Sequence, residues 1–207
     1  MTLLEALRAE TRDAHEALHV HPLLRPLTEP DLTREQYGAA LAAFDVFYRA
    51  MESGRTAAAP VGMPDAPAQR WLQSDLENLG QAPLDIVLAT PVADTPARVA
   101  GYLYVKQGST LGGAVMSKNL NRVLGLRPGL DQMFFAGYGP QTGRMWKFFI
   151  ENLSGGAPYL PQTEIIEMAV ASFQAIAAAC DAVHILKVAH AVQAPSGTQR
   201  EAAQGSA

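Results

Sequence analysis

Apolar residues recur three or four positions apart through most of this sequence, which is the spacing of one face of an α-helix. The first periodic stretch opens with Thr2 and Glu5, which match a capping box, and stops before Pro22. A second capping box, Thr33 with Gln36, opens the next stretch. Glycine and proline separate the stretches, in place of the paired-strand pattern of hairpins. The pattern predicts an all-α chain with helices over residues 2–19, 33–53, 68–79, 95–124, 139–153 and 162–191.

The segments outside these helices define the expected domain. Residues 56–67 hold three prolines, which predicts a surface loop. The chain has 207 residues, of which 48% are hydrophobic, and this is enough for one sizeable core. We therefore expect a single-domain helical bundle over residues 1–193. Residues 194–207 are rich in Gly, Ser, Gln and Ala, and we expect them to form a disordered C-terminal tail.

Charge and cysteine content exclude several classes of function. The net charge is −4, with 16 Lys and Arg against 20 Asp and Glu, and long runs of like charge are missing, so we expect no nucleic-acid partner. Cys180 is the only cysteine, which excludes an internal disulfide and a cysteine-bound zinc or iron–sulfur site. The first residues lack the layout of a secretory signal, and no apolar run approaches about 18 residues. We expect a cytoplasmic protein without a membrane span.

The first predicted helix holds a candidate iron ligand. At about 100° of rotation per residue, Arg8, Arg12, His15 and His19 fall within a sector of roughly 60° beside the apolar stripe. A neutral imidazole is the usual ligand of haem iron, and arginine pairs well with carboxylates such as the haem propionates. The same residues also fit a solvated stripe with a hydrogen-bonded histidine. Taken alone, this helix leaves both interpretations open.

The helix predicted over residues 95–124 contains three interior glycines, Gly108, Gly112 and Gly113. Each costs about 0.5–1 kcal/mol relative to alanine, so the helix needs a compensating reason for them. The glycines favour close approach of the backbone to a flat ligand, tight packing of a second helix on a Gly-x-x-x-Gly spacing, or a boundary between two shorter helices. The hydroxyls of Ser109 and Thr110 are able to hold ordered water beside them.

The two segments together resemble the haem oxygenase family. Residues 4–15, with Thr11 four positions before His15, resemble the proximal-helix signature of that family. Residues 108–113 resemble its glycine-rich distal helix, in the form found in bacterial members, including those partnered with bacteriophytochromes. The resemblance covers roughly residues 2–186. It implies the all-α haem oxygenase fold, with haem between the first helix and the distal helix.

The resemblance also implies roles for individual residues. His15 would bind the iron, and Gly108, Ser109 and Gly112 would form the catalytic distal face, with Gly113 as a further haem contact. Other haem-binding residues would be basic, near the propionate edge; they are Arg8, Arg12, Arg144 and Lys147. Two positions depart from relatives. Some have a carboxylate where this chain has His19, and animal members have an aspartate where it has Ser109.

The activity implied is oxidative opening of haem b, which is both cofactor and substrate, to biliverdin, carbon monoxide and ferrous iron. Oxygen is the oxidant, and the electrons come from an external donor, a ferredoxin or a flavin reductase, because the sequence lacks a nicotinamide or flavin fingerprint. A bilin-binding photoreceptor is a candidate recipient of the product.

Three alternatives remain open at this stage. A haem carrier or sensor would keep the fold without the chemistry. A di-iron carboxylate bundle would use Glu-x-x-His pairs, for which residues 16–19 and, with aspartate, residues 181–184 are candidates. A purely structural bundle would bind no haem.

Overall fold

The computed structural model describes residues 1–156 and 159–193. Helices dominate these residues and no β-strand forms among them, so the predicted all-α fold is confirmed. The predicted tail, residues 194–207, lies outside the described residues. The elements are α1 (Leu3–Val20), η1 (Arg25–Thr28), α2 (Arg34–Ser53), α3 (Ala68–Asn78), α4 (Pro96–Leu124), η2 (Gly139–Gln141), α5 (Thr142–Gly156) and α6 (Gln162–Gln193).

Local sequence signals set the helix boundaries. Thr2 with Glu5 and Thr33 with Gln36 form the capping boxes expected at the starts of α1 and α2. The Thr95 side chain caps α4 by accepting a hydrogen bond from the Arg98 N–H. These side chains satisfy backbone N–H groups that would otherwise lack partners at a helix start.

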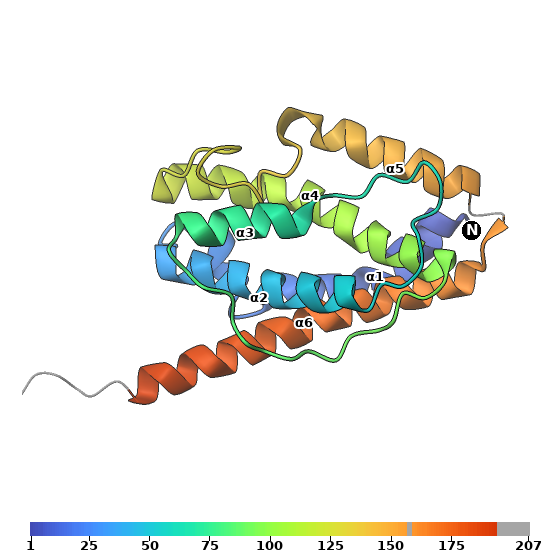
Figure 1. Cartoon of the computed structure of the whole chain (residues 1–207). Coiled ribbons are helices and arrows are strands. Elements are labelled where there is room, and N and C mark those ends of the chain that lie inside the picture. Colours follow the sequence, from blue (N-terminus) through green and yellow to red (C-terminus); the bar gives the residue numbers. More distant parts are fainter. Residues whose placement is uncertain (157–158, 194–207) are drawn as a thin grey trace, which may run out of the picture.

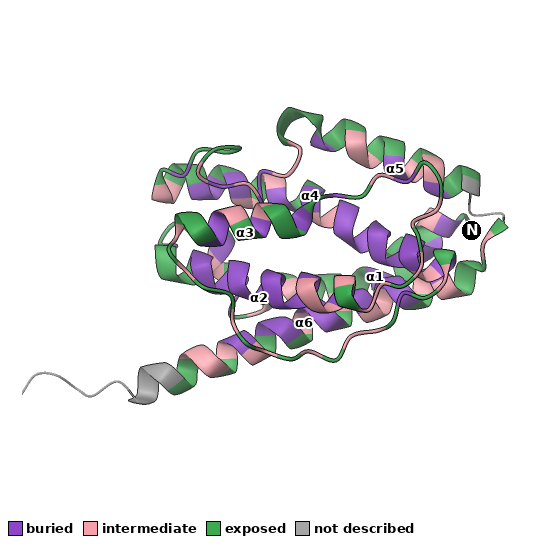
Figure 2. Ribbon diagram, in the orientation of Figure 1, coloured by how far each residue is buried: buried purple, intermediate pink, exposed green. Residues whose placement is uncertain are grey.

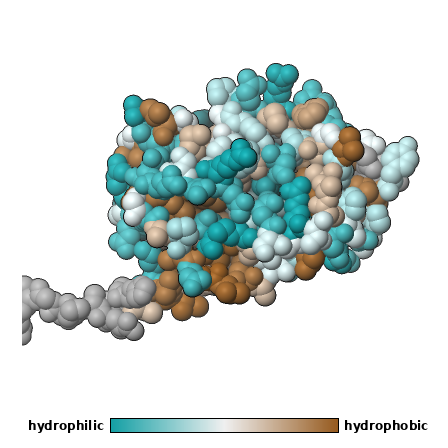
Figure 3. All heavy atoms as spheres, in the orientation of Figure 1, coloured by the Kyte–Doolittle hydropathy of each residue, from teal (hydrophilic) through white to brown (hydrophobic). Residues whose placement is uncertain are grey.

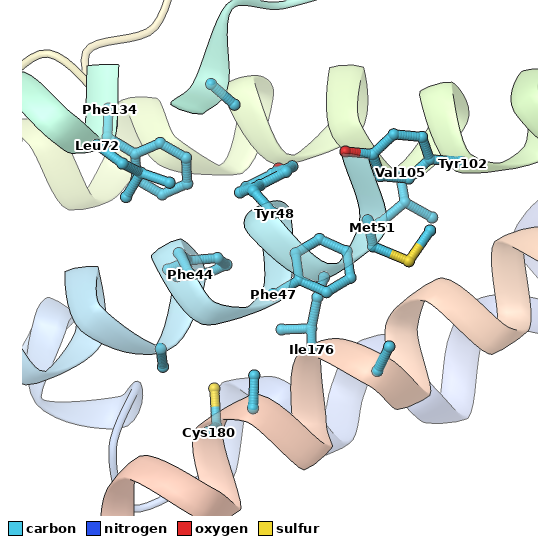
Figure 4. Close-up of a cluster of buried hydrophobic side chains, with 14 of the residues drawn as sticks. Phe44, Phe47, Tyr48, Met51, Leu72, Tyr102, Val105, Phe134, Ile176 and Cys180 are labelled. Atoms are coloured by element: carbon cyan, nitrogen blue, oxygen red, sulfur yellow. The ribbon is translucent and has the colours of Figure 1, made fainter. Parts of the chain in front are cut away.

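The core lies between α2, α4 and α6 (Figure 2). One side of α2 meets α6 and the other meets α4, with Phe44, Phe47 and Tyr48 from α2 close to Tyr102 and Ile176 (Figure 4). Aromatic rings in this cluster meet at tilted or edge-to-face angles, which their charge distribution favours.

Gly101 allows the close contact between α4 and α6. A Cβ atom at this position would meet the backbone of Ile165, and it would come 2.9 Å from the Cβ atom of Met168. Sequence reasoning did not single out this glycine, because its partner lies more than sixty residues further along the chain.

The last helix is long and apolar enough, over residues 162–189, to cross a membrane by length and composition. Polar residues interrupt this helix, so it contains no unbroken apolar run of about 18 residues, and its alanine-rich turns account for the high mean hydropathy. In the structure, α6 contacts α1, α2 and α4, as the central helix of a core does.

Candidate functional site

Two contacts tie the N-terminal region to α4. At the first, the Tyr104 hydroxyl lies beside the Thr11 side chain of α1, whose own hydroxyl donates to the Leu7 carbonyl oxygen at 2.7 Å. At the second, the Asn119 amide donates to the carbonyl oxygens of Leu27 (3.0 Å) and Glu29 (2.9 Å) beside η1. Thr11 precedes Leu27 in the chain, as Tyr104 precedes Asn119, so residues 11–29 and α4 run in the same direction. About 22 Å of α4 separates Tyr104 from Asn119, and His15 lies on the opposing segment between the ties.

One face of α4 is bare between these ties. Gly108, Leu111, Gly112 and Val115 follow the i, i+3, i+4, i+7 spacing of a single helix face. Leu111 and Val115 are exposed, with relative accessibilities of 44% and 63%. No heavy atom in the described part of the chain lies within 4 Å of a Cβ built on Gly112. The same face is covered earlier in the helix, at Gly101 and Tyr104, and again later, at Asn119.

His15 lies on α1 one turn after the Thr11 tie. Its ring meets the Phe173 ring of α6 edge-on at a centroid distance of 5.6 Å, and it meets the His19 ring at 4.6 Å. Burial lowers the pKa of His15, and the nearby His19 lowers it further. The imidazole is therefore neutral near pH 7, which is the form that binds iron.

The two basic residues predicted on α1 accompany His15. Arg8 and Arg12 are exposed, one turn apart, on the helix sector that contains His15. Arg8 lies near enough to Tyr104 for its charge to influence the pKa of that hydroxyl. Arg8 thus borders the region between α1 and α4, and Arg12 lies one turn further along the same helix sector.

The glycines of α4 face different surroundings. The Trp146 ring of α5 lies 3.7 Å from a Cβ built on Gly108, an ordinary contact distance. A Cβ on Gly113 would lie 2.8 Å from the carbonyl oxygen of Phe135, so packing of the 133–137 segment already requires that glycine. The helix runs unbroken through Gly112 and Gly113, so the alternative of two shorter helices does not apply. Gly108 and Gly112 share one helix face, but Trp146 covers it at Gly108, so the bare part begins beyond Gly108 and includes Gly112, and Gly113 lies off this face.

The two basic residues predicted on α5 point elsewhere. Two residues, or about 200° of rotation, separate Arg144 from the half-buried Trp146 that faces α4. Lys147 is exposed and lies 3.8 Å from Glu151 of its own helix. Arg144 therefore lies on a side of α5 away from Trp146, and Lys147 lies nearest a carboxylate of its own helix, so their contact with haem stays a prediction.

Ser109 lies beside the bare face, on the side toward α2. Its hydroxyl donates to the Lys106 carbonyl oxygen at 2.8 Å and lies 3.1 Å from the Tyr48 hydroxyl, which therefore acts as the donor in that pair. Burial raises the pKa of Tyr48, so the phenol stays protonated. Thr110 donates instead to the Gln107 carbonyl oxygen and is buried.

A partly buried ionic cluster lies behind Ser109, and sequence reasoning missed it. The Lys106 ammonium group pairs with Glu52 and Asp65, and the Tyr102 hydroxyl donates to Glu52 at 2.8 Å. Burial alone would raise the pKa of Asp65, but the charges and hydrogen bonds of Lys106 and Arg55 hold it below its usual value. A lysine in an apolar stretch of helix was the available signal, because a buried charge needs partners.

Two surface cavities lie outside the region between α1 and α4. One, of about 380 Å³, lies between α2 and residues 86–90, and the other, of about 300 Å³, opens beside Glu52, Asp65 and Lys106. The described residues contain no group of three or more His, Cys, Asp or Glu side chains able to hold a metal ion. The two Glu-x-x-His-like pairs considered for a di-iron centre are therefore not assembled into one site among these residues.

Comparisons with known proteins show the family and the fold. No curated protein sequence matches the chain. Among solved structures, it is similar to the haem oxygenase of Neisseria meningitidis, studied in NO- and CO-bound crystals, with a TM-score of 0.71 and 22% identity over 97% of this chain and 100% of that one. It is also similar to haem oxygenase-1 of the cyanobacterium Synechocystis in complex with haem, with a TM-score of 0.65 and 15% identity over 93% and 97% of the two chains.

The structural likeness, at these identities, establishes the fold. The family model described as Heme oxygenase matches residues 1–178, which is most of the sequence. The chain therefore belongs to the haem oxygenase family.

Proposed function

We propose that haem lies between α1 and the bare face of α4, with His15 as the iron ligand. As a haem oxygenase, the chain is an enzyme that degrades haem oxidatively. The observation that carries the placement is the uncovered stretch of α4 between its two ties, with a neutral histidine on the opposing segment.

The residues present fit a flat apolar ligand with acidic edges. Leu111 and Val115 offer apolar surface, and Gly112 lets the helix backbone approach a ring plane closely. When bound, haem supplies both the iron at which oxygen is reduced and the ring that is opened. His15 gives that iron an imidazole, without the strong electron push of a thiolate.

We assign the propionate edge to Arg8 and Arg12. They share the exposed sector of α1 with His15, whereas Arg144 and Lys147 lie on outward parts of α5. Charge-assisted hydrogen bonds from guanidinium groups would fix the rotation of the ring in its plane. That rotation decides which ring position faces Gly108 and Gly112.

We assign a positioning role to Ser109 and Tyr48. Because Ser109 donates to a backbone carbonyl and accepts from Tyr48, its remaining lone pair is fixed in direction and can accept from a water on the distal side. The ionisable groups behind it, Glu52, Lys106 and Asp65, lie beside a surface cavity. This arrangement supplies an ordered hydroxyl in place of the aspartate of animal relatives.

The substrate, products, domain limits, partners and location are also proposals. We propose haem b as the substrate, biliverdin, carbon monoxide and ferrous iron as the products, and residues 1–193 as the functional domain. A ferredoxin or flavin reductase would supply electrons, and a bilin-binding photoreceptor would receive the product. A cytoplasmic location fits the single, buried, unpaired Cys180.

The ligand assignment is tested by His15→Ala, with His19→Ala as the matched control from the same helix sector. We expect the first variant to bind haem without the histidine-ligated spectrum and to recover it when imidazole is added, while the control keeps it. His21 is a poor substitute, because its Nδ1 accepts from the Leu23 N–H and its Nε2 lies 3.1 Å from Asp181. Unchanged ligation in His15→Ala would overturn the assignment.

The activity is tested with the haem complex, oxygen and ascorbate. Loss of the Soret band with a new bilin absorbance is the expected result. A stable spectrum over the same period would instead favour a carrier or sensor. Ser109→Ala and Tyr48→Phe should slow this conversion and shift the spectroscopic pKa of the water bound to ferric haem, with haem affinity little changed.

A further inference from the structure

The connection between α3 and α4 contains an extended stretch that the haem site does not use. Residues 84–90 run alongside α2 without forming a helix, in the connection that passes below α2 and in front of α6 in Figure 1. Exposure alternates residue by residue: Leu84, Ile86, Leu88 and Thr90 are half-buried, while Asp85, Val87 and Ala89 are exposed. This period of two is the signature of a β-strand with one face on the protein and one face in water.

Both ends of the stretch are fastened to α2. The Leu84 carbonyl oxygen accepts from Arg49 at 2.7 Å, and the Thr90 hydroxyl donates to the Ala50 carbonyl oxygen at 3.3 Å. Just beyond, Ala93 forms a β-bridge with Arg55. The backbone groups of residues 85–89 have no hydrogen-bond partner within the described residues.

The stretch therefore presents an open strand edge. Val87, at its centre, is 95% exposed, and a cavity of about 380 Å³ separates the stretch from α2. A hydrophobic area appears on the lower side of the molecule in Figure 3, where this connection and α6 lie. Unpaired backbone groups beside exposed β-branched residues form a ready template for another strand.

The residues around Val87 are arranged symmetrically. Ile86 and Leu88 flank it, and Pro83 and Pro91 stand four positions away on either side. Leu84 and Thr90, the two fastened residues, stand three positions away. Two identical antiparallel strands that cross at Val87 would place each of these residues opposite its counterpart.

We propose that residues 84–90 pair with the same residues of a second copy of this chain, antiparallel, across a twofold axis at Val87. Backbone groups of alternate residues point to opposite edges of a strand. Since the Leu84 carbonyl points toward Arg49 of α2, the groups of Asp85, Val87 and Ala89 belong to the free edge. Val87 then forms a hydrogen-bonded pair with its own copy.

The charge and the prolines of this stretch favour a second copy of the chain as the partner strand. The single charge, Asp85, falls opposite Ala89 of the partner copy, so no like charges meet. Pro83 and Pro91 end the pairing on both sides, which closes the dimer and prevents further strand addition. The interface is small, so the dimer is reversible and depends on concentration.

Cysteine crosslinking tests the axis directly. In a hydrogen-bonded antiparallel pair the Cα atoms are about 5.5 Å apart, within the range a disulfide spans. We expect Val87→Cys to form a disulfide-linked dimer under mild oxidation. Val61→Cys is the matched control, because Val61 is an equally exposed loop valine away from the stretch, and the native Cys180 is buried.

Sedimentation velocity gives the second measurement. The unmodified chain should shift toward a dimer as concentration rises, and Val87→Asp, which sets two carboxylates against each other at the axis, should remain a monomer. Val61→Asp should behave like the unmodified chain. A chain that stays monomeric throughout, or equal crosslinking of the two cysteine variants, would overturn the proposal. Neither outcome changes haem ligation by His15. Failure of the dimer proposal can therefore be distinguished from failure of the proposed haem site.

Discussion

The two halves of α4 differ sharply although one unbroken helix contains both. Each residue from Val99 to Gln107 is buried, whereas Leu111, Gly112 and Val115 are exposed in the second half. The first half is held by α6 at Gly101 and by α1 at Tyr104. The second half presents a bare face until Asn119 meets the segment beside η1.

We therefore associate the first half of α4 with stability and the second half with the proposed haem site. The first half anchors the helix, and the second half offers a surface to a ligand at a fixed orientation. Glycine has a different role in each half, because Gly101 lets two helices touch, whereas a Cβ at Gly112 would meet no other element among the described residues. Substitutions in the first half should therefore alter folding, and those in the second half should alter haem binding.

The largest effect is expected at the boundary of the halves, from Lys106→Met. The lysine side chain is 5% exposed and pairs with Glu52 and Asp65, so its removal leaves Arg55 as their remaining cationic partner among the described residues. Breaking a buried ion pair costs about 3–5 kcal/mol, and partial exposure of the carboxylates places this case near 3 kcal/mol. Urea unfolding measures the loss. The control Lys147→Met removes an exposed pair and should cost less than about 1 kcal/mol.

Gly101→Ala should destabilise the first half by a smaller amount. The new methyl group would press on the α6 backbone at Ile165, and the helices must separate to admit it. Overpacking of this kind costs about 1–3 kcal/mol. Thermal unfolding of the haem-free protein measures it, and an unchanged midpoint would contradict the assigned contact.

Gly112→Ala should change the stability of the haem-free protein in the opposite direction. A methyl group there meets no heavy atom within 4 Å, and alanine is favoured over an interior glycine by about 0.5–1 kcal/mol. The haem-free variant should be slightly more stable, while its affinity for haem falls because the methyl group stands on the ligand face. Haem titration together with urea unfolding separates the two effects. Increased stability with unchanged haem affinity would remove Gly112 from the proposed site.

The smallest expected effect is on the pH dependence of folding stability. The pKa of Asp65 is lowered in the folded chain, so its contribution to stability is present above the pKa of the unfolded carboxyl, near 3.9, and is lost as pH falls through the lower folded value. Stability of the unmodified chain should therefore decrease with acid in this window. Asp65→Asn should show a flatter dependence there, measured by urea midpoints across the acid range.

Local sequence signals determined much of the fold. The helix starts at Thr2, Thr33 and Thr95 follow from capping and need only neighbouring residues. The extended 84–90 stretch and η1 escaped prediction, because their conformations depend on hydrogen bonds to distant parts of the chain. Resemblance to a family supplied His15, Gly108 and Gly112 as candidates, and the neutral imidazole and the bare face support them.

By itself, then, the sequence determined where helices form and, through its family resemblance, which residues are candidates for binding haem. Only the tertiary structure decided which part of α4 stays uncovered and that Gly113 lies against the Phe135 segment. The first half of α4 is apolar on every side, so its periodicity reveals no inward face. Helix position follows from contacts between residues close in sequence, but the surroundings of each face depend on contacts between residues far apart in the chain.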